Sequence, residues 1–548
     1  MNRTSGYKQP VWISTEPYSN RPDFPKLSRD VQVDVVIVGG GIAGISVAYE
    51  CVQKGLSVAL IEAREALSGE TGRTSGHLAS SLDDHYYELI NTFGEQGAKY
   101  AYESHQWALE RVGTISMNEG IDCEYRNLPG IMMVEVPDTD PTYNKKNNLP
   151  DEVDALKRLG IPHKFYPNGS IGKAYTGAVL EYEQQGVFHP TKYFCKRFEF
   201  WNRRANVLKE KHADKFQAYT HTRYVSHKDH GSSAGVTVST EGGQTLQGKH
   251  MVMTTNVPLQ KVAVVVKEAY YRTYCIAMRA PKGAFPDQLL YDNGDPYIYV
   301  RKTAHPDPNF EYLVIGGEDH KVGQETQEGY GKHYQRLEAW TREHYPFVEE
   351  TEFRWSGQIV EPNDYMAFIG KNAGMSENNV YICTGDSGNG LTHGVIAGRL
   401  LTDLMIGVEN PWASLYSPSR KPKPRTIPED IRENVDQNLQ YMRFLKTDVS
   451  DIESIPRCSG AVMHGGLKKL GKPVAVYKDG DGKVSTFSAI CPHMKGVVAW
   501  NASEMSWDCP IHGSRFDGLT GKCVMGPAIR GLHAEDEAGE EAQKGTSG

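Results

Sequence analysis

Two short Cys–His pairs near the end of the 548-residue chain have the residue types and spacing of a metal site. Cys491-Pro-His493 and Cys509-Pro-Ile-His512 together offer two thiolates and two imidazoles. A structural zinc site uses the same four donors, so zinc is the first alternative. Two features weigh against it: the first pair is closer than usual zinc spacing, and the second continues as Gly-Ser-Arg-Phe-Asp517.

A second stretch, Val33 to Glu62, has the pattern of a dinucleotide site. A run of mostly β-branched residues is followed by Gly-Gly-Gly-Ile-Ala-Gly, a helical segment, a second apolar strand and the acid Glu62. Gly39 permits the tight turn, Gly41 lets the backbone approach a pyrophosphate, and Gly44 lets the helix pack on the strand. A glycine-rich turn alone would be weak evidence, but this context predicts nucleotide binding, with Glu62 on the ribose.

Two further glycine-rich loops have the composition of ligand-binding segments. Residues 68–77 (SGETGRTSGH) are dense in glycine and hydroxyls, which suits either a polar ligand or a surface loop. Residues 380–394 (VYICTGDSGNGLTHG) repeat the order strand, turn and helix, and the start of that helix favours negative charge. Between these loops, apolar residues alternate in short segments of 270–319, which predicts an inserted antiparallel sheet.

The composition excludes several classes of protein. A hydrophobic content of 39% and a charged content of 23% describe a globular chain, and the net charge of −8 gives no positive field for nucleic acid or an anionic membrane. No apolar run approaches the ~18 residues of a spanning helix, and residues 1–26 lack a signal-peptide core. The nine scattered cysteines favour free thiols or metal ligands over disulfides. We therefore expect a cytoplasmic protein without nucleic-acid or membrane partners.

Shifts in composition divide the chain into five parts. The predicted parts are an N-terminal arm (1–30), an α/β domain with the inserted sheet (31–410), a Pro-rich linker with a docking helix (411–450), a small β-rich domain (451–533) and an acidic, disordered tail (534–548). In the linker helix one apolar stripe predicts the docking face, formed by Ile431, Val435, Leu439, Met442 and Leu445.

The Cys–His pairs, together with the later Gly526-Pro-Ala528, resemble the Rieske family. The resemblance implies a [2Fe–2S] cluster in which Cys491 and Cys509 bind one iron and His493 and His512 bind the other. It also implies that the loop at Gly526 covers the cluster. On this resemblance the iron–sulfur centre is preferred over zinc.

Residues 33 to about 408 resemble the FAD oxidoreductases of the D-amino-acid-oxidase (DAO) type, in VVIVGGGIAGISVAYEC, SGETGRTSGHLAS and VYICTGDSGNGLTHGVIAGRLL. Some relatives bond FAD covalently through a His in the first loop. Arg73 falls at that place here, so non-covalent FAD is expected. The resemblance implies contacts to FAD from Gly39, Gly41, Ile42, Ala43, Gly44, Glu62, Thr71, Arg73, Thr74, Ser75, Tyr224, Gly388, Gly390, Leu391 and Thr392.

The order of the domains, flavin first and Rieske last, resembles a subgroup of FAD-dependent oxidoreductases. The implied fold is an α/β FAD-binding Rossmann-type domain with an inserted antiparallel-sheet substrate domain, plus a small all-β Rieske domain at the C-terminus. The implied enzyme oxidises a small substrate beside nitrogen, in an amine, an N-methyl compound or an amino acid. Its FAD takes a hydride, and the cluster relays single electrons to an external acceptor protein.

Candidate catalytic residues are His77, Tyr297, Arg301 and His320, each more often structural than catalytic. Arg301 has the chemistry to clamp a carboxylate. Two alternatives stay open: electron flow from an external donor through the cluster to the flavin, for a reductive or oxygen-activating reaction (possible in secondary metabolism), and a non-enzymatic redox sensor. A Rieske oxygenase is disfavoured, because only an acidic tail follows the Rieske motif where a 2-His-1-carboxylate iron site would be expected.

Overall fold

The structure is a computed structural model that describes residues 5–20, 23–171, 175–195, 215–232, 234–259, 263–373, 377–464 and 471–534. Apart from Ala534, the tail predicted to be disordered lies outside these residues. Within them, no helix is both long and apolar enough to cross a bilayer. The helices are α1 (Val11–Thr15), α2 (Ile42–Gln53), α3 (Tyr86–Asn118), α4 (Tyr143–Lys146), α5 (Leu149–Leu159), α7 (Gly329–His344), α8 (Gly390–Met405), α9 (Ala413–Tyr416) and α10 (Ile427–Leu439).

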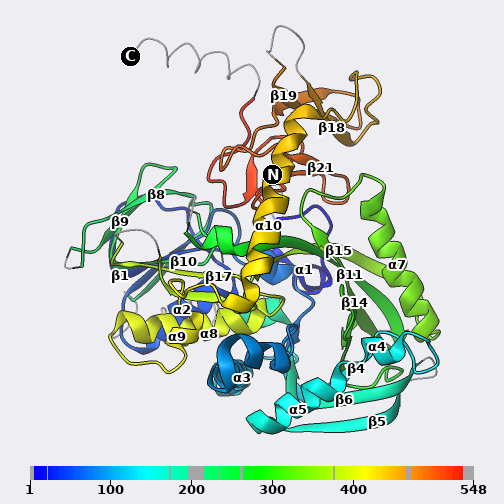
Figure 1. Cartoon of the computed structure of the whole chain (residues 1–548). Helices are drawn as coiled ribbons and strands as arrows, with labels where there is room; N and C mark the ends of the chain where they lie inside the picture. Colours follow the sequence, from blue (N-terminus) through cyan, green and yellow to red (C-terminus); the bar gives the residue numbers. More distant parts are fainter. Residues whose placement is uncertain are drawn as a thin grey trace, which may run out of the picture.

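The main domain, which we define as the part of the chain with strands β1 to β17, contains two sheets (Figure 1). The first of them is largely parallel. Its central strand β1 is buried on both faces over its second half, which explains the continuous apolar run of the sequence. Helices α2 and α8 pack against each other, and both start at the cavity described below. In spatial order the strands are β16 (Phe368–Lys371), β17 (Val380–Thr384), β10 (Thr245–Met253), β1 (Val31–Val38), β2 (Val58–Ile61) and β7 (Phe216–Tyr219), with β8 (Tyr224–Asp229) and β9 (Val236–Thr240) joined to β10.

A predominantly antiparallel sheet forms the second half of the main domain and confirms the predicted insertion. Strand β11 is buried along most of its length, and α7 packs against β11 and β14. In spatial order the strands are β15 (Thr351–Pro362), β11 (Glu268–Pro281), β14 (Phe310–Lys321), β13 (Tyr299–Ala304), β12 (Leu289–Asp292), β4 (Arg126–Met133), β6 (Tyr175–Val187) and β3 (His77–Leu78), with β5 (His163–Ile171) paired to β6.

The small domain, which we define as strands β18 to β24, is entirely β and lies against one end of the main domain (Figure 1). Its core contains Trp500, Trp507 and Phe516 together with Cys491 and Cys509. Its two sheets are β18 (Ser459–His464), β19 (Pro473–Lys478) and β20 (Val484–Ser488), and β21 (Ala499–Asn501), β22 (Ser506–Asp508), β23 (Arg515–Asp517) and β24 (Cys523–Met525).

Helix α10 connects the two domains along the outside of the molecule (Figure 1). It docks with its polar side: Glu433 is buried and forms an ion pair with Lys321 at 2.8 Å, and Gln437 donates a hydrogen bond to the Glu268 carbonyl. The predicted apolar docking stripe faces outward, and Leu445 at its end is 81% exposed. Apolar periodicity marked the helix, but ion pairing and hydrogen bonding to the main domain decide which face is buried.

The N-terminal arm lies in the seam between the two domains. Trp12 is fully buried and its indole N–H donates to the Thr74 carbonyl at 2.6 Å. Closer to the terminus, the Tyr7 amide donates to Glu504 of the small domain at 2.6 Å, and Arg515 donates to the Ser5 carbonyl at 2.8 Å. The arm therefore belongs to the interdomain contact.

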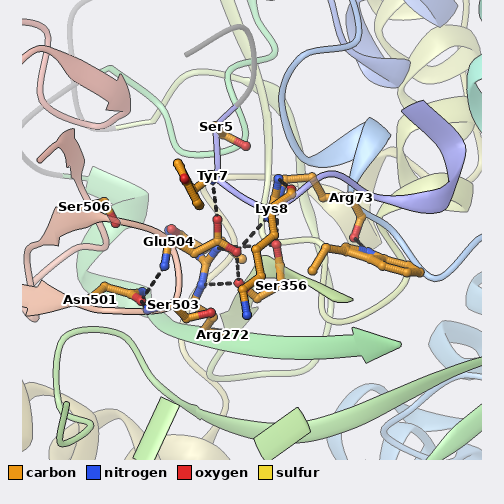
Figure 2. A network of polar contacts seen from close by, with 12 residues as sticks. Ser5, Tyr7, Lys8, Arg73, Arg272, Ser356, Asn501, Ser503, Glu504 and Ser506 are labelled. Atoms are coloured by element: carbon orange, nitrogen blue, oxygen red, sulfur yellow. Dashed lines mark hydrogen bonds and ion pairs between the residues drawn. The ribbon is translucent and has the colours of Figure 1, made fainter. Parts of the chain in front are cut away.

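Glu504 is the centre of a buried ionic cluster across the same seam (Figure 2). Its carboxylate lies 2.7 Å from Arg73 and 3.7 Å from Arg272, and it accepts a hydrogen bond from the Ser356 hydroxyl. Burial alone would raise the pKa of the Glu504 carboxyl, but the arginines Arg73, Arg272 and Arg515 lower it to about 2. The small domain is thus fixed to the main domain by charges that have no access to water.

Replacing Glu504 by Ala tests this ionic cluster, which we call the clamp. The change leaves Arg73 and Arg272 buried without their carboxylate, so we expect the free energy of unfolding to fall by about 3–5 kcal/mol, measured by urea denaturation. The control is Glu95→Ala, whose ion pair with Arg158 is exposed and whose loss should change stability by about 0.5 kcal/mol or less. Equal effects of the two variants would contradict the clamp.

The clamp also predicts a pH dependence with a definite sign. Because the pKa of Glu504 is depressed in the folded state, its stabilisation is complete above its ordinary pKa of 4.5 and is lost as the pH falls toward about 2. Wild-type stability should therefore fall more steeply across this window than that of the Glu504→Ala variant.

Candidate functional site

An extended cavity lies where the two sheets of the main domain meet the small domain. Gly39 and Glu62 line it from the parallel sheet, and Tyr291 and Tyr299 line it from the antiparallel sheet. The small domain contributes the segment 523–529, at and after β24. A ligand in this cavity touches both domains.

Most residues predicted to bind FAD line this cavity. They are Gly39, Gly41, Ile42, Ala43, Glu62, Thr71, Arg73, Thr74, Ser75, Tyr224, Gly388, Gly390 and Leu391. Gly44 and Thr392 lie behind the wall. A Cβ on Gly44 would overlap the Gly39 carbonyl oxygen, so this glycine serves the packing of α2 on β1. Thr392 donates its hydroxyl to the Asn389 carbonyl within the first turn of α8.

The donors and acceptors along the cavity fit FAD. Glu62 stands at the end of β2, where its oxygens accept hydrogen bonds from the backbone amides of Gly40 and Arg64, both at 2.9 Å. This holds the carboxylate at the place that the fingerprint assigns to the ribose. Also in the cavity lining, the buried Asn256 amide nitrogen has no partner among the described residues, as expected of a group that meets a polar ligand.

Two of the four catalytic candidates, His77 and Tyr297, line the cavity. His77 Nε2 is buried without a hydrogen-bond partner among the described residues, and its ring lies 5.4 Å from that of Tyr299. Burial and the nearby Arg301 lower the pKa of His77 to about 3, so the imidazole is neutral. Tyr297 donates its hydroxyl to Asp83 at 2.6 Å.

The other two candidates, Arg301 and His320, do not line the cavity. Arg301 is fully buried and donates to the carbonyls of Gly76 and Phe188, while its guanidinium stacks on Trp12. It therefore braces the first loop and is not placed to clamp a carboxylate. His320 shares a hydrogen bond with the Tyr274 hydroxyl at 2.9 Å and stacks on that ring.

The four predicted iron ligands are brought together on two loops of the small domain. The side chains of Cys491 and Cys509 share a hydrogen bond, and the rings of His493 and His512 are 5.0 Å apart. His512 Nδ1 is buried and has no partner among the described residues, which suits a metal ligand. The donors thus form one sulfur pair and one nitrogen pair.

This pairing fits a two-iron cluster better than a single zinc ion. A structural zinc ion takes all four donors on one metal, whereas here sulfur pairs with sulfur and imidazole with imidazole. A [2Fe–2S] cluster needs only two protein ligands on each iron. Backbone amides of Ile511 and His512 also point to the Cys509 sulfur, as hydrogen bonds to cluster ligands do.

The Gly526-Pro-Ala528 loop lies between the ligand loops and the cavity. The Ala528 amide donates to the Ser514 hydroxyl at 3.0 Å, and Gly526 and Ala528 also line the cavity. Arg223 and Arg64 of the main domain donate to the carbonyls of Cys523 and Val524 at the base of this loop. The predicted cover of the cluster is therefore also a wall of the FAD cavity.

Gln358 on β15 links the cavity to the cluster loop directly. It lines the cavity, is 2% exposed, and neither its Nε2 nor its Oε1 has a partner among the described residues. Its amide packs on Gly513, where a Cβ would overlap it. Beside it, the ring of Tyr270 lies edge-on to His512 with centroids 5.8 Å apart. Two residues of the main domain thus meet the loop that carries His512.

The sequence interpretation missed several of these residues. Asp83 and Asp292 line the cavity, Gln358 reaches the cluster loop, and Glu504 holds the two domains together. The Asp83-Asp84 pair, a short distance after the first loop and β3, was a usable signal. Gln358 and Glu504 stand in unremarkable sequence, and only the tertiary structure gives them a role.

Comparison with known proteins agrees with this architecture. Residues 34–404 match the family model described as FAD dependent oxidoreductase, and residues 454–534 match the Rieske [2Fe-2S] domain. The chain is 29% identical over 522 residues to the protein YhfW of Bacillus subtilis, which is named as a Rieske 2Fe-2S iron-sulfur protein; the match covers 94% of this chain and 96% of YhfW.

Each half also has relatives of its own. The small domain is 40% identical over 77 residues to a cytochrome b6-f complex iron-sulfur subunit of Nostoc, in a match covering 13% of this chain and 41% of that subunit. The main domain superposes on the glycine oxidase of Geobacillus kaustophilus with a TM-score of 0.55 and 17% identity, covering 72% of this chain and all of that one. The latter likeness concerns the fold.

Replacing Cys509 by Ser tests the assignment of the cluster ligands. We expect loss of iron, acid-labile sulfide and the EPR signal of the reduced cluster, with flavin retained, because the FAD cavity needs no cysteine ligand. The control is Cys458→Ser, which alters an exposed free thiol and should change neither cofactor. Full iron content in the Cys509→Ser variant, or zinc in the wild type, would contradict the assignment.

Proposed function

Because the chain belongs to the FAD-dependent oxidoreductase family and carries a C-terminal Rieske [2Fe–2S] domain, we propose that it oxidises the C–N bond of an amine, an N-methyl compound or an amino acid and relays the electrons through the cluster to an external acceptor protein. FAD, when bound, accepts a hydride and gives up electrons singly, and the cluster carries one electron at a time. We place the reaction in the cytoplasm, in line with the scattered cysteines of the sequence.

The observation that carries the proposal is the shared wall between the FAD cavity and the cluster loop. Gln358 lines the cavity on one side and packs on Gly513 on the other. Gly526 and Ala528 of the cluster cover also face the cavity. This arrangement supports transfer between the two cofactors within one chain, without any movement of the small domain.

In this proposal the chain's own residues bind the nucleotide, orient the cofactor and exclude water from the cavity. The glycine loop and Glu62 hold the nucleotide, and the segment Thr71–Ser75 lines the continuation of the cavity. FAD is proposed to be non-covalent, because Arg73 stands at the place of the bonding His and is committed to Glu504. The neutral imidazole of His77 lines the cavity beside the Tyr299 ring, where its Nε2 is left to donate or accept one hydrogen bond.

Anaerobic mixing with candidate amines and amino acids tests the proposal. We expect flavin absorbance to bleach first and cluster absorbance to follow, with the reduced cluster visible by EPR. Bleaching by NAD(P)H or a reduced partner protein alone would instead support the opposite direction of electron flow. No reduction of either cofactor by any donor would favour the redox-sensor alternative.

Replacing Gln358 by Leu tests the shared wall in the same experiment. Leu has a similar volume and removes an amide without partners, so the fold should be retained. We expect the rate of cluster reduction to fall at least severalfold relative to the rate of flavin bleaching in the same variant, because the contact with the Gly513 loop is altered. The control, Gln324→Leu, changes an exposed residue and should leave both phases alone. Identical cluster kinetics in the wild type and Gln358→Leu would exclude this route.

A further inference from the structure

One side of the cavity, which we call the tyrosine wall, consists of Tyr291, Tyr297 and Tyr299 with the carboxylates Asp83 and Asp292. Strands β12 and β13 and the segment between them supply all of these residues except Asp83, which follows the first loop. The wall thus comes from the inserted sheet, where a substrate site is expected.

Among the described residues, no cationic side chain with a free donor lines the tyrosine wall; Arg301, two residues after Tyr299 on β13, lies outside the cavity and donates to the carbonyls of Gly76 and Phe188. The arginines that line the cavity, Arg64, Arg73 and Arg223, are engaged with Val524, Glu504 and Cys523 of the small domain, respectively. Lys146 approaches Asp292 from outside the cavity, but it forms an ion pair with Glu135 at 3.0 Å.

The histidines that line the cavity are neutral as well. Burial lowers the pKa of His77 to about 3, and it also lowers the pKa values of His85 and His393. A substrate carboxylate at this wall would therefore lie beside two acids without a counter-charge. Burying an uncompensated charge in this way is strongly unfavourable, so amino acids fit this wall poorly.

Asp292 offers an unused acceptor. It is 7% exposed, and its Oδ1 accepts hydrogen bonds from the backbone amides of Gly294 and Ile298 at 3.0 and 3.1 Å. Its Oδ2 has no hydrogen bond or ion pair within the described part of the chain, although Asp292 lines the cavity. One oxygen is thus anchored and the other is left for a ligand.

The charge state of this wall responds to a bound cation. Burial raises the pKa of Asp292 to about 7 and that of Asp83 to about 6. A neighbouring cation stabilises the ionised form of both groups. The tyrosine rings add to this: Tyr297 and Tyr299 lie 5.4 Å apart, and aromatic faces attract ammonium groups.

We infer that the substrate is an organic cation, an amine that carries no carboxylate, whose charged nitrogen pairs with Asp292 Oδ2 against the tyrosine rings. This inference rests on the proposed function and narrows its substrate class. A site for amino acids would need a free cation, such as an arginine, to bind the substrate carboxylate. The tyrosine wall instead offers the carboxylate of Asp292.

Matched ligand pairs test the inference on the FAD-loaded full chain. Each pair is an amino acid and the amine that remains without its carboxylate: L-proline with pyrrolidine, N,N-dimethylglycine with trimethylamine, and L-phenylalanine with 2-phenylethylamine. Binding is read from the perturbation of the flavin spectrum, separately from bleaching. We expect at least one amine to bind about tenfold or more tightly than its amino acid. Equal or tighter binding of the amino acids, or no perturbation by any amine, would overturn the inference.

The Asp292→Asn variant supplies the second arm. Asn keeps the Oδ1 acceptor for the two backbone amides, so the loop should hold, while the negative charge is lost. We expect amine binding to weaken about tenfold, with Asp287→Asn as control, because Asp287 is half exposed and pairs with Arg126. Unchanged amine binding in Asp292→Asn would contradict the inference.

The same titration separates this inference from the proposed function. Flavin that is bleached by the amino acids and not by the amines would support oxidation beside nitrogen and overturn the substrate class. Amines that bind at Asp292 without bleaching the flavin would support the substrate class and contradict the proposed oxidation.

Discussion

The carboxylate of Glu504, buried among arginines, is the contact on which the arrangement of the two domains depends. Arg73 and Arg272 belong to the main domain and Glu504 to the small one, and none of these side chains reaches water. Either side alone would bury charge without compensation, which is costly in a low-dielectric interior. Because Arg73 belongs to the loop that also lines the FAD cavity, the shape of that cavity and the docking of the small domain are linked.

A fixed interface changes the role of the iron–sulfur domain. The segment 523–529 completes the cavity wall, and Tyr270 and Gln358 meet the loop of His512 from the other side. A domain that had to swing away would expose these buried contacts and break the ionic cluster in every cycle. The geometry instead supports the proposal that the cluster stays beside the flavin while electrons pass between them.

Short sequence motifs predicted those parts of the site that depend on local spacing alone. The glycine fingerprint, the acid Glu62 and the Cys–His pairs depend on short-range spacing; the structure places the first two at the cavity and brings the Cys–His pairs together. Arg301 was a reasonable candidate on its strand, but two carbonyls from distant segments capture it. Glu504 and Gln358 gain their meaning from contacts across the domain seam. Helix α10 shows the same limit: its apolar stripe predicted a docking face, yet the ion pair of Glu433 turned the stripe outward.

The measurement that tests the central claim most directly is the rate of electron transfer after flash reduction of the flavin, followed through cluster absorbance in the absence of oxygen. Transfer between fixed neighbours in one chain predicts a first-order rate that does not change when the protein is diluted. A rate that rises in proportion to protein concentration would mean that electrons pass between molecules and would contradict the account.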